Sequence, residues 1–207
     1  MSVDPGGTVV TGRRLDPDSR RQEILDAALR LWGERPYAAV STTELAEAAG
    51  IARGLIHHYF GTKRGLYLEV VRRLTAIPDA AVDELPPGPP SLRARAAVDW
   101  FLDTVERHRG MWLAVGMVAG GGDAEVDAIV AEADEVAADR VLAALAPVAA
   151  SDETVRARVR SFFGLVRSAS REWLVRGTLD RAETRDLLVA VLLRVLDLSP
   201  TGREGAP

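Results

Sequence analysis

Residues 45–66, LAEAAGIARGLIHHYFGTKRGL, decide the fold of the first third of the chain. They predict a short helix, a turn at Gly50, a second short helix over about residues 52–60, and a third helix that begins near Lys63. Gly50 supplies the permissive backbone that such a turn needs. The arrangement is typical of a helix-turn-helix, which can place its second helix in the major groove of DNA.

Helical patterns continue on both sides of this stretch. Ser41 and Glu44 form a capping box that predicts a helix start at Thr42, and an earlier helix is expected to begin at Asp16–Pro17 or at Ser19. Residues 78–91, after the helix that begins near Lys63, carry five prolines and are either a loop or a frayed helix. Apolar residues then recur at helical spacing over residues 92–108, 111–118, 123–145, 155–175 and 180–198. The sequence therefore predicts an all-α protein with about nine helices.

The distribution of charge divides the chain into two parts. The 207 residues carry a net charge of −4, but residues 1–75 sum to +2 and residues 76–207 to −6. This polarity suits a DNA-binding head, residues 16–75, on an acidic body, residues 76–200, although random scatter is an alternative. The chain has no cysteine, which excludes disulfides and zinc–thiolate sites. Without a signal peptide or a membrane-spanning run, a cytoplasmic location is expected.

The second helix of the motif must show one face to the core and another to DNA. Ile56 and Phe60 are four residues apart and are expected to pack inward together. The guanidinium fork of Arg53 suits the O6 and N7 atoms of guanine. Hydroxyl groups and a lysine at helix N-termini can bind phosphates. The predicted DNA-binding residues are Thr42, Thr43, Arg53, Gly54, Leu55, His57, His58, Tyr59 and Lys63.

Residues 21–71, RQEILDAALRLWGERPYAAVSTTELAEAAGIARGLIHHYFGTKRGLYLEVV, resemble the DNA-binding domain of the TetR/AcrR family of bacterial repressors. The resemblance implies the same DNA-facing positions from Thr43 to Lys63. Leu55 stands where the family often has Thr, His57 where it often has Tyr, and Ala52 where Ser is common. The resemblance therefore implies the mode of DNA binding and leaves the operator sequence open.

The resemblance also implies that the rest of the chain binds a ligand and forms a dimer. Residues 171–196, REWLVRGTLDRAETRDLLVAVLLRVL, resemble the closing helix pair of the family. Their apolar residues extend around more of the circumference than one core face needs, which predicts a second buried surface. We expect a homodimer through the last two helices, packed as a four-helix interface. Two-fold symmetry then predicts a palindromic operator.

Aromatic and methionine side chains in the body predict a pocket for an apolar or amphipathic small-molecule effector. The candidates are Trp100, Phe101, Met111, Trp112, Met117, Phe162, Phe163 and Trp173. For each of them, an ordinary core position is the alternative. Asp99, Asp103 and His108 could orient a polar or cationic ligand, but a solvated helix face is the preferred interpretation.

The sequence does not favour catalysis. Two of the three histidines are adjacent in the proposed recognition helix, and no Gly-x-Ser-x-Gly elbow, P-loop or helical Glu-x-x-His pair is present. We expect no enzyme activity, no cofactor and no metal. The favoured hypothesis is a homodimeric repressor that leaves its operator when an effector binds. The alternatives are a constitutive DNA-binding protein without effector control, and an interaction module whose aromatic residues are only core.

Overall fold

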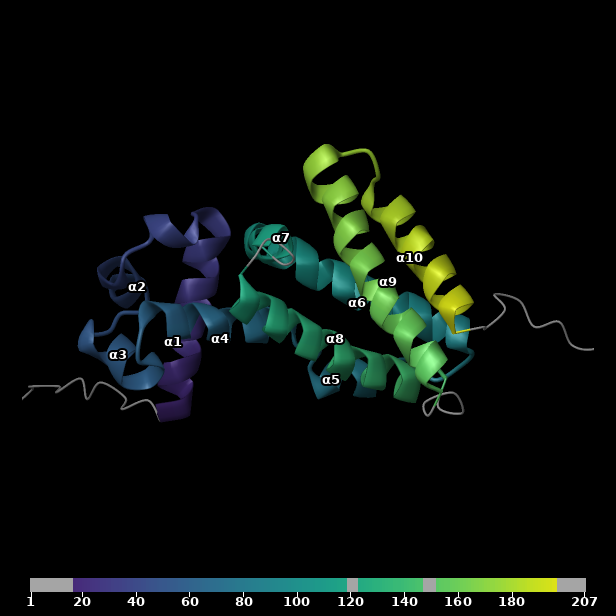
Figure 1. Ribbon diagram of the computed structural model, residues 1–207, viewed down its shortest axis with the longest axis horizontal. Coiled ribbons are helices and arrows are strands. Elements are labelled where there is room, and N and C mark those ends of the chain that lie inside the picture. The colour runs from purple at the N-terminus through teal and green to yellow at the C-terminus, as the bar shows by residue number, and fades with distance from the viewer. Residues whose placement is uncertain (1–16, 119–122, 147–151, 197–207) are drawn as a thin grey trace, which may run out of the picture.

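The computed structural model describes residues 17–118, 123–146 and 152–196. These ranges form helices and contain no β-strand, which confirms the all-α prediction. Figure 1 shows α1 to α4 gathered at one end of the molecule and α6, α8, α9 and α10 at the other. We call these parts the head and the body. Within the described ranges no helix is long and apolar enough to cross a membrane.

The head follows the capping signals in its sequence. It comprises α1 (Pro17–Glu34), a 3-10 turn (Tyr37–Ala39), α2 (Thr42–Ala48), α3 (Gly54–Phe60) and α4 (Lys63–Thr75). Ser41 and Glu44 form the expected capping box, and the Thr62 hydroxyl accepts a hydrogen bond from the backbone N–H of Gly65 at the start of α4. The first helix begins at Pro17, where the fixed φ of proline suits a first helical position. Asp16, the alternative start of this helix, lies outside the described residues.

One apolar cluster holds the head together and continues into the body. Ile24 of α1, Leu45 of α2, Ile56 of α3 and Leu66 of α4 are each at most 1% exposed. The same cluster includes residues of the body, namely Met111, Val115, Val126, Ile129 and Val130. The head is therefore packed on the body through a shared core, and the boundary between residues 75 and 76 stays a prediction.

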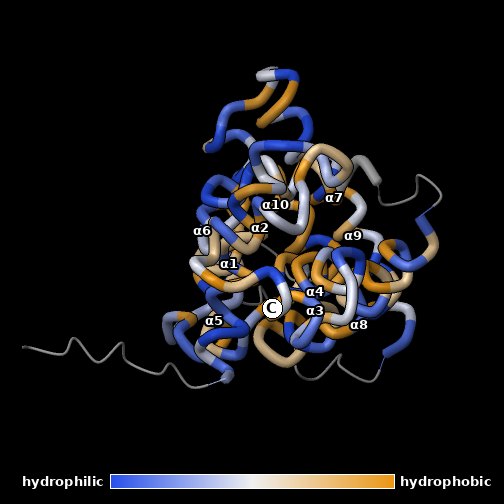
Figure 2. The backbone as a smooth tube through the Cα atoms, turned by 90° about the vertical axis from the view of Figure 1, so that its left-hand side faces the viewer, coloured by the Kyte–Doolittle hydropathy of each residue, from blue (hydrophilic) through white to orange (hydrophobic). Residues whose placement is uncertain are grey.

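The body is a bundle of four long helices closed by three shorter elements. The long helices are α6 (Pro90–Arg107), α8 (Ala124–Leu145), α9 (Glu153–Arg171) and α10 (Arg181–Val195). α10 packs on α6 and α9, and α8 packs on the same two helices from the other side. The shorter elements are α5 (Asp79–Asp83), α7 (Arg109–Val118) and a π-helical turn (Glu172–Arg176) that ends at Gly177. Figure 2 shows hydrophobic and hydrophilic stretches alternating along the helices, as expected when each helix buries one face.

Two contacts besides the shared core fix the head to the body. Arg64, in the first turn of α4, pairs with Asp123 at 2.5 Å and with Glu125 at 3.0 Å, at the start of α8. The last turn of α1 also crosses the first turn of α7 where Gly33 meets Gly110. A Cβ atom at position 110 would lie 1.6 Å from the carbonyl oxygen of Gly33. Only glycine fits at such a crossing.

Candidate DNA interface and effector cavity

The structure places the predicted recognition helix on the surface of the head. Ile56 is 1% exposed and belongs to the head core, and Phe60 packs against that core. Arg53, Gly54, His57 and His58 are exposed, and Leu55 and Tyr59 are half-buried beside them. The α3 helix begins at Gly54, not at residue 52, because Arg53 is the N-cap residue and no side chain caps this end. The ridge from Arg53 to Tyr59 therefore faces outward with its apolar support behind it.

The start of α2 presents Thr42 half-buried and Thr43 exposed. An ion pair between Arg35 and Glu44, with a distance of 2.6 Å, ties the end of α1 to this helix start. The Arg35 hydrogen bond, aided by the bonds from Ser41, lowers the pKa of Glu44 to about 2. Glu44 is therefore a carboxylate throughout the ordinary pH range, and it holds α2 in the orientation that presents both threonines.

Lys63 is bound within the head. Its Nζ donates a hydrogen bond to the carbonyl oxygen of Tyr37 at 2.7 Å and lies 4.2 Å from the centroid of the Tyr37 ring. The 3-10 turn presents this carbonyl, and no sequence pattern predicts the contact. An ammonium group has three N–H donors, so two remain for a phosphate. A contact between Lys63 and a DNA phosphate therefore stays a prediction.

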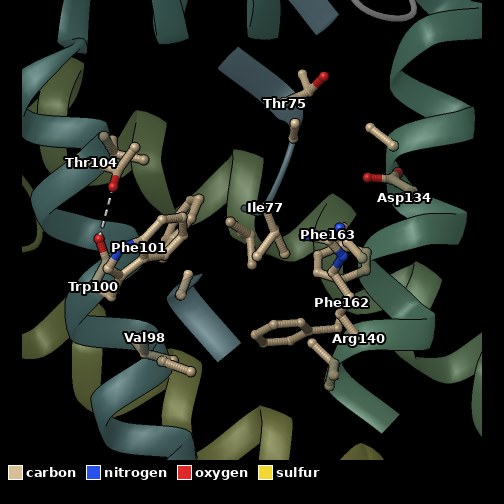
Figure 3. A pocket seen from close by; sticks show the side chains of 18 of the residues that line it. Thr75, Ile77, Val98, Trp100, Phe101, Thr104, Asp134, Arg140, Phe162 and Phe163 are labelled. Atoms are coloured by element: carbon tan, nitrogen blue, oxygen red, sulfur yellow. Dashed lines mark hydrogen bonds between the residues drawn. The ribbon is translucent and has the colours of Figure 1, made fainter. Parts of the chain in front are cut away.

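The body contains a partly open cavity of about 150 Å³ between the end of α4 and helices α5 to α10. Its wall includes five of the predicted effector residues, Trp100, Phe101, Trp112, Phe162 and Phe163. Figure 3 shows Trp100, Phe101 and Thr104 on one side of this cavity and Asp134 and Arg140 on the other. Ile77, in the link between α4 and α5, lies between them.

Three predicted effector residues are not part of the described wall. Met111 is 1% exposed and belongs to the core that the head shares with α7 and α8. Trp173 packs against the bundle core in the π-helical turn, away from the cavity. The side chain of Met117 lies outside the described residues. Periodicity placed all three on apolar faces but could not say which neighbour each face meets.

Two of the three polar residues considered for a ligand have other partners. Asp99 and Asp103 pair with Arg181 and thereby join α6 to α10. Burial, aided by Arg107 and Arg73, lowers the pKa of His108 below its usual value, so this side chain is neutral at pH 7. None of the three lines the cavity.

The charged residues of the cavity wall come from α8 and α9 and were missed in the sequence. Arg167 binds Asp134 with two hydrogen bonds of 2.9 and 3.0 Å. Arg140 pairs through Nη2 with Asp79 at 2.6 Å, while its Nη1 is buried and has no hydrogen-bond partner among the described residues. On an amphipathic helix such charges are usually solvated, so no sequence signal pointed to these three. No group of three or more potential metal ligands occurs in the described ranges.

The faces of α9 and α10 form a shallow groove that shares Phe162 with the cavity wall. Apart from Arg158, small or apolar residues line it, namely Thr154, Ala157, Ser161, Phe162, Leu165, Val191 and Val195. Leu187 is 38% exposed and continues the row of Val191 and Val195 at spacings of four. This face belongs to the helix pair expected to form the dimer.

Comparison with known families matches both parts of the chain. Residues 24–70 match the family described as "Bacterial regulatory proteins, tetR family". Residues 90–195, about half of the chain, match the family described as "Tetracyclin repressor-like, C-terminal domain". The first match contains α2, α3 and the start of α4, and the second contains most of the cavity wall.

Individual relatives agree with these families. The HTH-type transcriptional regulator BetI of Rhizobium meliloti is 44% identical over 55 residues, 27% of each chain. The HTH-type transcriptional activator FasR of Mycolicibacterium smegmatis is 33% identical over 111 residues, 49% of this chain and 48% of FasR. The chain thus spans about a quarter to a half of these curated relatives. A tetR-family regulator from Streptomyces coelicolor has a similar crystal structure, with a TM-score of 0.69, 27% identity, and coverage of 92% of this chain and 93% of that one.

Proposed function

The chain belongs to the TetR family of DNA-binding transcriptional regulators, and we propose that it is a homodimeric repressor with a small-molecule effector. In this proposal α3 reads a palindromic operator, α9 and α10 form the dimer, and an effector in the cavity releases the DNA. A protein that binds the bacterial chromosome acts in the cytoplasm, so the proposal includes that location.

The exposed ridge of α3 carries the DNA-binding part of the proposal. Arg53 stands at the start of the helix, where a recognition helix meets base edges, and its fork fits guanine. His57, His58 and Tyr59 follow on the same surface and can donate to phosphates or bases. Thr42, Thr43, Gly54, Leu55 and Lys63 complete the proposed interface.

The groove of α9 and α10 supports the dimer. Residues at spacings of four or seven, such as Ala157, Ser161 and Ser168, keep the outward face of α9 small enough for close packing of a second helix. A symmetric dimer brings the same patch of both subunits together. The two α3 helices then face successive major grooves, about 34–36 Å apart or a multiple of it, which is why the operator is expected to be palindromic.

The cavity supports effector control, because α4 connects it to the head. The C-terminal end of α4 contributes Leu74 and Thr75 to the cavity wall, and its N-terminal end follows α3 directly. Release of the operator needs a coupling free energy of only about 1–3 kcal/mol between the two sites. A constitutive DNA-binding protein would have no use for an apolar cavity at this place.

A gel shift with the DNA upstream of the protein's own gene tests the proposed interface. Arg53→Ala is expected to weaken specific binding by about 1–3 kcal/mol and to relax specificity at one base position. Arg30→Ala, on the exposed face of α1, is the matched control and should bind as the wild type does. If both variants bind with the affinity and selectivity of the wild type, the assignment of α3 as the recognition helix is wrong.

The sign of regulation is tested separately. The relative FasR is named an activator, so a repressor is the proposal and an activator is its competitor. The expression of a reporter gene under the upstream promoter should rise when the gene for this protein is deleted. A fall in the reporter would instead establish activation and leave the DNA-binding assignment intact.

A further inference from the structure

The charges in the cavity wall point to a class of effector. We infer that the effector is an amphiphile with a single anionic head group, held by Arg140, and an apolar body of about six to eight carbons. This inference rests on the proposed function, in which the cavity is the effector site. It adds the charge, the size and the orientation of the ligand.

The guanidinium group of Arg140 has one terminal nitrogen in an ion pair and the other without a hydrogen-bond partner among the described residues. Its Nη2 pairs with Asp79 of α5, whose side chain is 84% exposed at the rim. Its Nη1 is buried in the cavity wall without a hydrogen-bond partner among the described residues. A buried donor that is left unsatisfied raises the free energy of the folded protein. A carboxylate, sulfonate or phosphate oxygen from a ligand would satisfy it.

The other polar groups of the wall do not favour a cation. Asp134 is the one carboxylate among the described lining residues, and Arg167 already holds both of its oxygens. The hydroxyls of Thr75 and Thr104 donate to backbone carbonyls of their own helices. The charged lining residues therefore sum to one positive charge, that of Arg140, which Asp79 outside the lining partly offsets. A cationic ligand would have to break the pair of Asp134 and Arg167.

The remaining wall is apolar and sets the size of the ligand. Trp100, Phe101 and Val98 of α6 stand across the cavity from Arg140, with Ile77 between (Figure 3). A cavity of about 150 Å³ compares with an engineered apolar cavity that accepts one benzene molecule. An alkyl chain of about eight carbons can fold or extend from Arg140 toward α6 within such a space.

Three ligands with eight carbons each and different heads test the inference. Octanoate, 1-octanol and octylammonium are titrated into the full chain below their aggregation concentrations, with calorimetry and intrinsic tryptophan fluorescence, to which Trp100 and Trp112 of the cavity wall contribute, as readouts. Octanoate should bind at least about tenfold more tightly than 1-octanol, and octylammonium most weakly. Because this ranking uses the wild-type protein, it holds whatever happens to a variant.

Variants then locate the head group. Arg140→Met should weaken octanoate binding about tenfold to a hundredfold and leave 1-octanol binding unchanged. Arg140→Lys, which keeps the charge, should retain part of the preference for octanoate. Arg160→Met is the matched control, because Arg160 lies outside the cavity on α9 and pairs with Glu135 and Glu153. It should bind octanoate as the wild type does.

The outcomes separate this inference from the function on which it rests. If 1-octanol or octylammonium binds as tightly as octanoate, or if Arg140→Met binds octanoate normally, the anionic assignment is wrong and the cavity stays the effector site. If none of the three ligands binds, the inference is wrong and the effector belongs to another chemical class. The gel shift without any of the three ligands tests the DNA-binding function by itself.

Discussion

Substitution of Gly110 by alanine tests how closely the head is packed on the body. At the crossing of α1 and α7, a Cβ atom on residue 110 would lie 1.6 Å from the carbonyl oxygen of Gly33 and 2.5 Å from its carbonyl carbon. Real Cβ contacts are essentially never shorter than 3.0 Å. Backbone atoms block the methyl group, so no side chain can rotate away. The two helices would have to separate by about 1.4 Å to reach that limit.

The cost follows from overpacking and helix propensity. Overpacking of this kind destabilises by about 1–3 kcal/mol, and the better helix propensity of alanine returns up to about 1 kcal/mol. We expect Gly110→Ala to lose about 1–2 kcal/mol, which lowers Tm by about 2–8 °C in a chain of this size. Gly33→Ala is the matched control on the other helix of the same crossing. Its Cβ would meet its nearest neighbour, the backbone nitrogen of Met111, at an ordinary 3.6 Å.

Thermal melting and gel shift together measure the effect. Gly33→Ala should melt at or slightly above the wild-type temperature, whereas Gly110→Ala should melt below it. Because α1 belongs to the head and α7 to the body, separation of the two also changes how the head is aimed at DNA. Operator affinity should therefore fall in Gly110→Ala more than in Gly33→Ala. Equal melting temperatures for Gly110→Ala and the wild type would refute the close crossing of these helices.

Two further predictions concern the dimer and the pH dependence of the head. Leu187→Glu should produce monomers in analytical ultracentrifugation and lose operator binding, because it places a charge on the proposed α9–α10 interface. Val136→Glu, at a similarly exposed position on α8, should stay dimeric. A dimeric Leu187→Glu protein would contradict the interface. Glu44 has a folded pKa of about 2 against an ordinary 4.5, so its stabilisation is fully present above pH 4.5 and is lost as the pH falls toward 2. The difference in Tm between wild type and Glu44→Gln should accordingly be constant above pH 5 and shrink toward pH 2, and a difference that grows with acid would show that Arg35 does not hold this carboxylate.

Local signals in the sequence were enough for the head. Ser41 begins a helix as its capping box predicted, since a cap depends on residues within three positions of itself. The side chains of Thr62 and Asp180 cap two further helix starts in the same way. The exposed ridge of α3 followed from the spacing of Ile56 and Phe60. The predicted α3 was two residues too long at its start. No capping side chain marks this end of the helix, where Arg53 is the N-cap residue.

Long-range contacts limited what could be predicted for the body. Whether Met111 faces a cavity or the head depends on α1, which lies more than 75 residues earlier in the chain. The same holds for Arg140. Its partner Asp79 comes from the proline-rich segment, whose sequence is compatible with either a loop or a frayed helix. Periodicity identifies a buried face and leaves its neighbour undetermined, so five of eight candidates reached the cavity and its charged residues were not among them.

The position of α4 explains how the two proposed sites could be coupled. Its 13 residues span about 20 Å, from the end of α3 to the cavity wall at Leu74 and Thr75. Near the head, Arg64 forms ion pairs with Asp123 and Glu125 at the start of α8. The hydrogen bond from Arg64 lowers the pKa of Asp123, so this ion pair stays charged at neutral pH. A ligand that displaces the cavity end of α4 therefore acts on a helix held at its other end by a fixed point of the body. A rigid helix with one fixed end must rotate rather than slide, and rotation is the motion that changes the separation of two α3 helices across a dimer.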